Sequence, residues 1–407
     1  MSILTTGIRL TKRGILTITI LFFFFFAWYN MCSIYIPQHV FSSSAENQLI
    51  LTVSFNFVIF LTLLLARFII HEFNEMRIIL GCSILTSIVT TLLIFTSSII
   101  LRSLFFLMGG IFFSIGQLGS FVYFWNLTVP EERGRIGGLI GFFSLPLTFL
   151  VVAMAENLDF SGIILLSVIL SSGTLVIKPL NPEKKEILIT KEKEWGYQPE
   201  RRTILFYSIP WIVFSLINAT LAKNISLHFS QQLSSSIYIY LIVSQSLAVV
   251  LGALIGGIVA DFFGRRLAIA FSLTLYGISS ALAGLVMNYE LLYLVYFANG
   301  LNWGILLTLY SWVVWGDLTN KESCIKRYSI GMIIYYLSMG IGFLIDKTLL
   351  IPLIFSSLLS CLLIFLSNIP ILLAPELLSS DFRERIKMKL HMNILKRIGR
   401  KKPQNQG

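Results

Sequence analysis

Charged residues are scarce in this sequence, and that scarcity limits the class of protein it can be. Only 13% of its 407 residues are Asp, Glu, Lys or Arg, against about 25% in ordinary soluble domains. In contrast, 56% are hydrophobic. This balance excludes a water-soluble globule and predicts an all-α polytopic protein whose main partner is the lipid bilayer. The net charge of +11 would favour nucleic acid only if the basic residues covered a soluble surface. They cluster between apolar runs instead, so we expect no nucleic-acid partner.

Cysteine and histidine are also rare, with four of each. The cysteines have no CxxC spacing and lie mostly inside apolar runs, which is typical of small buried hydrophobes. The histidines are too far apart in sequence to indicate a metal site. The apolar runs contain no HExxH motif, no paired inner carboxylates and no Ser/His arrangement. We therefore predict no metal, no other cofactor and no enzymatic activity.

Twelve apolar runs are each long enough to cross about 30 Å of hydrocarbon as a helix. In the first half they cover residues 14–37, 48–70, 77–97, 103–127, 135–155 and 160–177. In the second half they cover residues 203–226, 237–260, 267–288, 291–316, 328–345 and 349–374. The charged segment 179–202 separates six spans from six. It predicts an N-terminal bundle (1–178), a linker, a C-terminal bundle (203–374) and a basic tail (375–407), which has the pattern of an amphipathic helix.

The distribution of Lys and Arg predicts the orientation of these spans. If the N-terminus lies inside, all but three of the 31 basic residues fall on inner segments, and the exceptions are Arg102, Lys223 and Lys347. Inner loops of membrane proteins carry such an excess. We expect a plasma-membrane protein with both termini in the cytoplasm and an inner linker.

A short charged loop between spans eight and nine carries the most specific motif. Residues 257–266 read Gly-Ile-Val-Ala-Asp-Phe-Phe-Gly-Arg-Arg. The residues of the pattern are Gly257, Asp261, Gly264, Arg265 and Arg266. The spacing Gly-x-x-x-Asp-x-x-Gly-Arg-Arg resembles the cytoplasmic-loop signature of the major facilitator superfamily of transporters, although Phe262 stands where that family usually has a basic residue. The resemblance implies twelve transmembrane helices in two pseudo-symmetric six-helix bundles around a central cavity, with this loop gating alternating access.

Two further loops extend the resemblance. Residues 72–77, between spans two and three, align with residues 261–266 but keep only the acid (Glu72), the Phe and the last Arg (Arg77). The loop between spans four and five is similar to a second signature of the same family. It contains Glu131, Arg133 and Arg135. Glu131 lies near the start of a helix, where the helix dipole favours a negative charge. We predict gating roles for all of these residues.

Polar side chains inside the spans are the candidates for binding a substrate, because each costs free energy in hydrocarbon unless it meets a partner or water. They are Asn30, Gln117, Asn218, Gln245, Asn299, Asn302, Trp303 and Tyr310. In the family that the chain resembles, helices one, four, seven and ten line the cavity. For any single residue, a hydrogen bond between helices is the more common explanation. As a set, they predict a shared aqueous cavity.

No Asp or Glu lies in the central part of any span. Because proton-coupled carriers usually have a membrane-embedded carboxylate, a facilitator or a carrier for a neutral solute fits better, and a coupling ion is left open. We predict a monomeric secondary transporter of a small, neutral or polyhydroxylated, sugar-like compound. The alternatives are efflux of drug-like amphiphiles and a membrane sensor that keeps the fold without transport.

Overall fold

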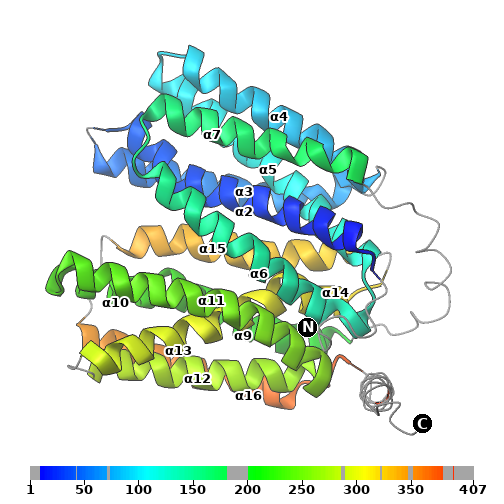
Figure 1. The fold of residues 1–407 in the computed structure, drawn as a ribbon, viewed down its shortest axis with the longest axis vertical. Helices are drawn as coiled ribbons and strands as arrows, with labels where there is room; N and C mark the ends of the chain where they lie inside the picture. Colours follow the sequence, from blue (N-terminus) through cyan, green and yellow to red (C-terminus); the bar gives the residue numbers. More distant parts are fainter. Residues whose placement is uncertain are drawn as a thin grey trace, which may run out of the picture.

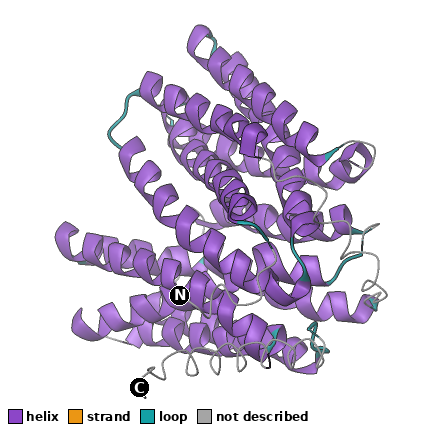
Figure 2. Ribbon diagram, turned by 45° about the vertical axis from the view of Figure 1, so that its right-hand side comes forward, coloured by secondary structure: helices purple, strands orange, loops and turns teal. Residues whose placement is uncertain are grey.

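The computed structural model describes residues 10–42, 44–70, 74–180, 200–285, 289–320, 323–346, 352–378 and 388. Helices make up all of the regular structure in these residues (Figure 2). The first half contains α2 (Lys12–Val40), α3 (Ala45–Ile70), α4 (Glu75–Phe95), α5 (Ile99–Leu127), α6 (Pro130–Ala155), α7 (Phe160–Gly173) and the 3₁₀ helix η1 (Thr174–Leu180). The second half contains α9 (Arg201–Ala219), α10 (Leu221–Gln232), α11 (Ser235–Phe263), α12 (Arg265–Leu285), α13 (Tyr289–Thr308), the π-helix η3 (Leu309–Val313), α14 (Val314–Asp317), α15 (Cys324–Asp346) and α16 (Leu353–Leu373).

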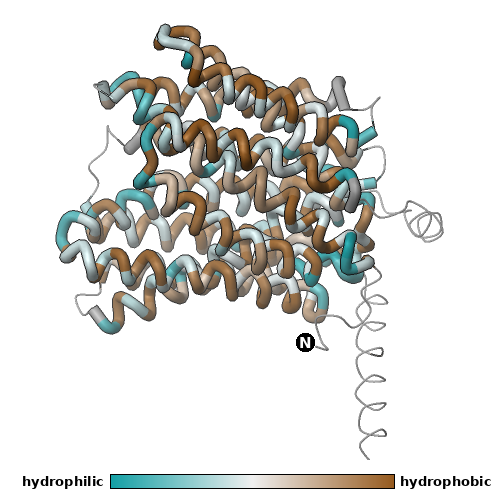
Figure 3. The backbone as a smooth tube through the Cα atoms, turned by 45° about the horizontal axis from the view of Figure 1, so that its top comes forward, coloured by the Kyte–Doolittle hydropathy of each residue, from teal (hydrophilic) through white to brown (hydrophobic). Residues whose placement is uncertain are grey.

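The helices match the predicted spans. By length and composition, eleven helical segments of the described chain could each cross a membrane. The remaining predicted span, 328–345, lies within α15. Apolar residues dominate the middle of the helices, and polar residues gather at both ends of the bundle (Figure 3). Because large apolar side chains such as Leu65 and Leu294 are 59% and 65% exposed, the outer surface suits lipid rather than water, and the chain is a multi-pass membrane protein.

The two halves of the chain form two neighbouring groups of helices. Helices α2 to α7 lie on one side of the molecule and most of α9 to α16 on the other (Figure 1). The main contacts between the groups join α6 to α11 and α3 to α15. The predicted linker 179–202 and the predicted amphipathic tail lie almost entirely outside the described residues.

Glycines permit the close approach of α6 and α11. A Cβ atom on Gly257 would collide with the carbonyl oxygen of Gly134, and a Cβ atom on Gly138 would lie 2.9 Å from the carbonyl oxygen of Ala253. Gly252 and Gly256, also on α11, face α13 instead. Backbone contact between the two halves therefore depends on Gly138 and Gly257, and not on Gly252 and Gly256.

Candidate functional site

The carboxylate of Asp261 joins the two halves of the protein. It accepts hydrogen bonds from the backbone N–H groups of Gly134 (3.0 Å) and Arg135 (2.9 Å), both on α6. The Nε of Arg135 donates to the same carboxylate at 3.0 Å, and the Nη1 of Arg265 is 2.8 Å from it. Three of these four contacts cross from one half to the other, which places Asp261 at the centre of the interface.

A second acid, Asp317, completes this arrangement at the end of α14. It forms ion pairs with Arg133 on α6 and, at 2.9 Å, with Arg265. Sequence reasoning had not assigned a role to Asp317, because it lies at the end of a span with no motif around it. Its position beside a basic inner loop was the signal available in the sequence.

We call Arg133, Arg135, Asp261, Arg265 and Asp317 the ion-pair cluster. None of their side chains is more than 2% exposed. Leaving one member of a buried ion pair without its partner costs about 3–5 kcal/mol, although the intact pair adds little net stability relative to water. The cluster therefore closes this end of the bundle firmly while its members stay together.

Glu376, just after α16, binds the start of α12. Its carboxylate accepts hydrogen bonds from the backbone N–H groups of Arg265 (2.7 Å) and Arg266 (3.1 Å). Gly264, immediately before α12, has a φ of +108°, which a residue with a Cβ atom rarely adopts. The side chain of Arg266 donates to the carbonyl oxygen of Ala374 at 3.1 Å. Arg266 therefore binds the C-terminal segment and is not part of the ion-pair cluster.

The corresponding loop of the first half is built differently. Glu72 lies outside the described residues, and Arg77 is exposed at the start of α4. Glu75 accepts a hydrogen bond from Asn126 at 2.7 Å, a contact within the first half. The backbone carbonyl of Glu131 accepts a hydrogen bond from Arg135 at 3.1 Å. Of the predicted loop residues, Arg133, Arg135, Gly257, Asp261 and Arg265 gather at the interface between the halves. Gly264 and Arg266 contact the C-terminal segment, and Arg77 is exposed.

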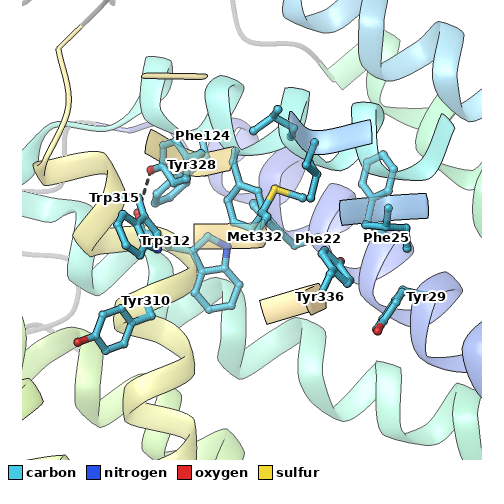
Figure 4. Close-up of a cluster of buried hydrophobic side chains, with 14 of the residues drawn as sticks. Phe22, Phe25, Tyr29, Phe124, Tyr310, Trp312, Trp315, Tyr328, Met332 and Tyr336 are labelled. Carbon is cyan, nitrogen blue, oxygen red and sulfur yellow. Dashed lines mark hydrogen bonds between the residues drawn. The ribbon is translucent and has the colours of Figure 1, made fainter. Parts of the chain in front are cut away.

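A cavity lies between the two halves. Aromatic rings dominate its walls. Figure 4 shows the buried hydrophobic cluster that includes some of the lining side chains, among them Tyr310, Trp315 and Tyr336. The lining residues are Phe26, Gln117, Phe121, Trp211, Leu307, Tyr310, Ser311, Trp315, Tyr328, Gly331, Met332, Tyr335 and Tyr336. Eight of these thirteen are aromatic, and none is charged. They come from both halves, which is where an alternating-access carrier has to hold its substrate.

Two of the eight predicted substrate residues, Gln117 and Tyr310, line this cavity. The side-chain oxygen of Gln117, on α5, accepts a hydrogen bond of 2.6 Å from the hydroxyl group of Tyr336, on α15. The bond crosses the interface between the halves. It fixes the orientation of the amide, whose nitrogen retains its capacity to donate.

Four other predicted residues form hydrogen bonds outside the cavity. Gln245 donates to Asn299 at 3.2 Å, which ties α11 to α13 within the second half. Asn30 and Asn302 each donate to the carbonyl oxygen four residues earlier in their own helix, at 2.8 Å in both cases. Only the bond between Gln245 and Asn299 joins two helices, as the alternative explanation requires; those of Asn30 and Asn302 lie within one helix.

The last two predicted residues also lie away from the lining. Trp303 packs against the main core and against a smaller apolar cluster that includes Leu145 of α6, and Asn218 is half-buried on α9. Sequence reasoning missed most of the aromatic lining, including Trp211 and Trp315. Aromatic residues are common throughout these spans, so their identity alone did not distinguish the cavity wall from the rest of the core.

A π-helical turn brings part of this wall together. In η3 the backbone N–H of Val314 donates to the carbonyl oxygen of Leu309, five residues earlier. The wider turn allows Tyr310 and Trp315, five residues apart, to line the same cavity. In an α-helix of 3.6 residues per turn, such a pair would point in clearly different directions. Asp317 of the ion-pair cluster follows Trp315 by two residues, so one helix serves both the cavity and the cluster.

No protein-family model matches the chain, and no curated protein matches it by sequence. Solved structures do match it. The human organic anion transporter MFSD10 has a TM-score of 0.66 and 14% identity, with 88% of this chain and 99% of that chain covered. The proton:xylose symporter XylE has a TM-score of 0.68 and 14% identity, with 89% and 96% covered.

A third similar structure is a bacterial homologue of the iron transporter ferroportin in an outward-facing state. Its TM-score is 0.69 at 12% identity, with 90% of this chain and 99% of that chain covered. Identities this low establish the architecture and leave the substrate open, because one fold serves many functions. Together with the loop signature around Asp261, these matches show that the chain has the fold of the major facilitator superfamily transporters.

Proposed function

We propose that this protein is a secondary transporter that moves a small, uncharged organic solute across the plasma membrane by alternating access. The proposal is carried by the central cavity, which both halves line, together with the buried ion-pair cluster between the same halves. A cavity that both halves line can open to either side of the membrane when the halves rock against each other.

The ion-pair cluster suits the role of a gate. Asp261 and Asp317 hold α6 of the first half against α11 and α14 of the second. When the halves separate, each charged group exchanges its protein partner for water. Because the pairing energy and the hydration energy of such groups nearly balance, the closed and open states can differ by only a few kcal/mol. We propose that the gate faces the cytoplasm, as the distribution of basic residues predicts.

The lining of the cavity supports an uncharged substrate. An ion moved into a mainly apolar site needs an opposite charge to offset its lost hydration, and the described lining residues provide none. The same lining contains no carboxylate that could carry a coupling proton, which supports facilitated diffusion. The aromatic walls favour the drug-like amphiphile, which the sequence analysis gave as an alternative, over the sugar-like compound that it predicted.

Counterflow in proteoliposomes tests the proposal. Purified protein is first screened by thermal shift against neutral, anionic and cationic compounds, and any stabilising compound is then used radiolabelled. We expect protein-dependent accumulation driven by unlabelled compound inside the vesicles, and its loss in Trp211→Ala. A compound that binds the purified protein but shows no counterflow would instead indicate a sensor with the transporter fold.

A further inference from the structure

We propose that the central cavity is built for an uncharged ligand that combines a flat aromatic face with a hydrogen-bond acceptor. This assignment of substrate class rests on the proposed transport function, because it concerns the same cavity. It is carried by three features of the described lining: the absence of charge, the arrangement of the rings, and the polar groups that have no partner.

Trp211 lies nearly parallel to two other rings of the wall, whereas Tyr335 and Tyr336 are nearly perpendicular, with 81° between their planes. Trp211 stacks on Tyr310 with 4.8 Å between ring centroids and 16° between planes, and Trp211 and Tyr335 are 6.2 Å apart at 14°. All of these rings line the cavity. Offset stacking of aromatic rings contributes about 0.5–1.5 kcal/mol beyond the burial of area. A ligand ring placed along this wall would extend the stack.

Two donors in the lining have no acceptor. The indole nitrogen of Trp315 and the hydroxyl group of Tyr310 are buried, and neither has a hydrogen-bond partner among the described residues. An indole N–H can only donate. A buried donor without an acceptor costs about 1–3 kcal/mol, and a ligand with a carbonyl, ether or ring-nitrogen acceptor could remove that cost.

Organic cations are the obvious competitors, because aromatic faces attract them. However, the described lining has no carboxylate to offset the lost hydration of a cation. The acids nearest in sequence to the wall, such as Asp317, are already paired with arginines. A cation would also leave the two unpaired donors without an acceptor. An uncharged acceptor fits both the rings and the donors.

A polyol fits the hydrogen-bonding groups of the lining less well. Each of its hydroxyl groups needs both a donor and an acceptor when buried. Two hydroxyl groups of the lining already donate within the protein, that of Tyr328 to the carbonyl oxygen of Trp312 (2.9 Å) and that of Tyr336 to Gln117 (2.6 Å). With these protons committed, few donors are left for the oxygens of several ligand hydroxyl groups, whereas a single ligand acceptor needs only one donor.

The test is a matched fragment series on the full-length protein in nanodiscs. The series contains neutral aromatic amides and ketones, the corresponding aromatic carboxylates, the corresponding quaternary ammonium compounds, ring-matched hydrocarbons without the acceptor, and simple sugars. Binding is measured by thermal shift and by quenching of tryptophan fluorescence. We expect the neutral acceptor-bearing fragments to bind more tightly than all of the other groups.

Three variants locate the interaction. Trp315→Phe and Tyr310→Phe keep a ring and remove a donor, so each should weaken binding of the acceptor-bearing fragments by about tenfold, the equivalent of one hydrogen bond of about 1.4 kcal/mol. They should leave the hydrocarbon analogues unchanged. Trp303→Phe, which alters a tryptophan outside the cavity lining, serves as the matched control and should have no effect.

The assignment is overturned if charged fragments or sugars bind most tightly, if no neutral aromatic fragment binds, or if both donor variants bind like the wild type. Failure of the transport proposal is distinguishable from these results. Donor-dependent binding of neutral aromatic fragments without counterflow would refute transport and keep the ligand class. Counterflow of a sugar or an ion would support transport and refute the ligand class.

Discussion

Replacing Asp261 by alanine removes the acceptor on which the contact between α6 and α11 converges. Arg265 keeps its second partner, Asp317, at 2.9 Å. The damage therefore falls on Arg135, which loses its ion pair, and on the backbone N–H groups of Gly134 and Arg135. All of these groups are buried in the closed cluster and would reach water once the halves separate.

The shift in the equilibrium between closed and open molecules follows from the different burial of these groups in the two states. Removing one member of a buried ion pair costs about 3–5 kcal/mol in the state that buries it, and little where the remaining partner is hydrated. Taking the lower value, the ratio of closed to open molecules should fall roughly 150-fold. Asp261→Asn retains an amide oxygen that can accept from some of these donors, so its effect should be smaller.

Pulsed electron–electron resonance between spin labels on the two halves measures this ratio. Labels at Lys12→Cys on α2 and Leu267→Cys on α12 use exposed positions outside the cluster, in a background without the native cysteines. We expect one short distance in the parent protein and a second, longer distance in Asp261→Ala. The control Glu156→Ala removes an exposed acid after α6 and should leave the distribution unchanged. Identical distributions in Asp261→Ala and the parent, together with unchanged transport, would refute the gating role.

Three further predictions concern packing, the C-terminal segment and the cavity. Gly257→Ala should destabilise the closed state by about 1–3 kcal/mol, because the added Cβ atom meets the backbone of α6. The control Gly81→Ala should have no effect, because nothing lies within 4 Å of its Cβ position. The same spin-label distances measure both variants. Glu376→Gln weakens the cap of α12 and should lower the stability by about 1 kcal/mol, measured as a lower melting temperature in detergent. Gln117→Leu and Tyr336→Phe should show a coupling of about 1 kcal/mol in a double-mutant cycle of thermal stability, since they share one buried hydrogen bond; strict additivity would contradict this contact.

Sequence reasoning was strongest where the physics is local to one stretch of chain. The number and position of the spans depend on runs of apolar residues longer than the hydrocarbon core is thick, and such runs are visible without any knowledge of packing. The 257–266 loop was recognisable for the same reason. Its glycines, acid and arginines stand at fixed spacings within ten residues.

The cavity was much harder to predict. Gln117 and Tyr310 line it, but Asn30 and Asn302 bind the backbone of their own helices and Gln245 binds Asn299. A polar residue in a span needs a partner, and the sequence does not show whether that partner is a neighbouring helix or a substrate. The face that each residue presents depends on helix rotation, and near Tyr310 the π-turn changes that rotation.

By itself, the amino-acid sequence determined that this chain crosses the membrane many times as helices and that a charged loop lies between spans eight and nine. Hydrophobic length and motif spacing are properties of one continuous segment, and they do not change when the chain folds. Only the tertiary structure decided that Asp317 joins Asp261 in holding the halves together, and that aromatic rings rather than amides form most of the cavity wall. Those features arise where residues from opposite halves meet, and their positions depend on how the helices pack.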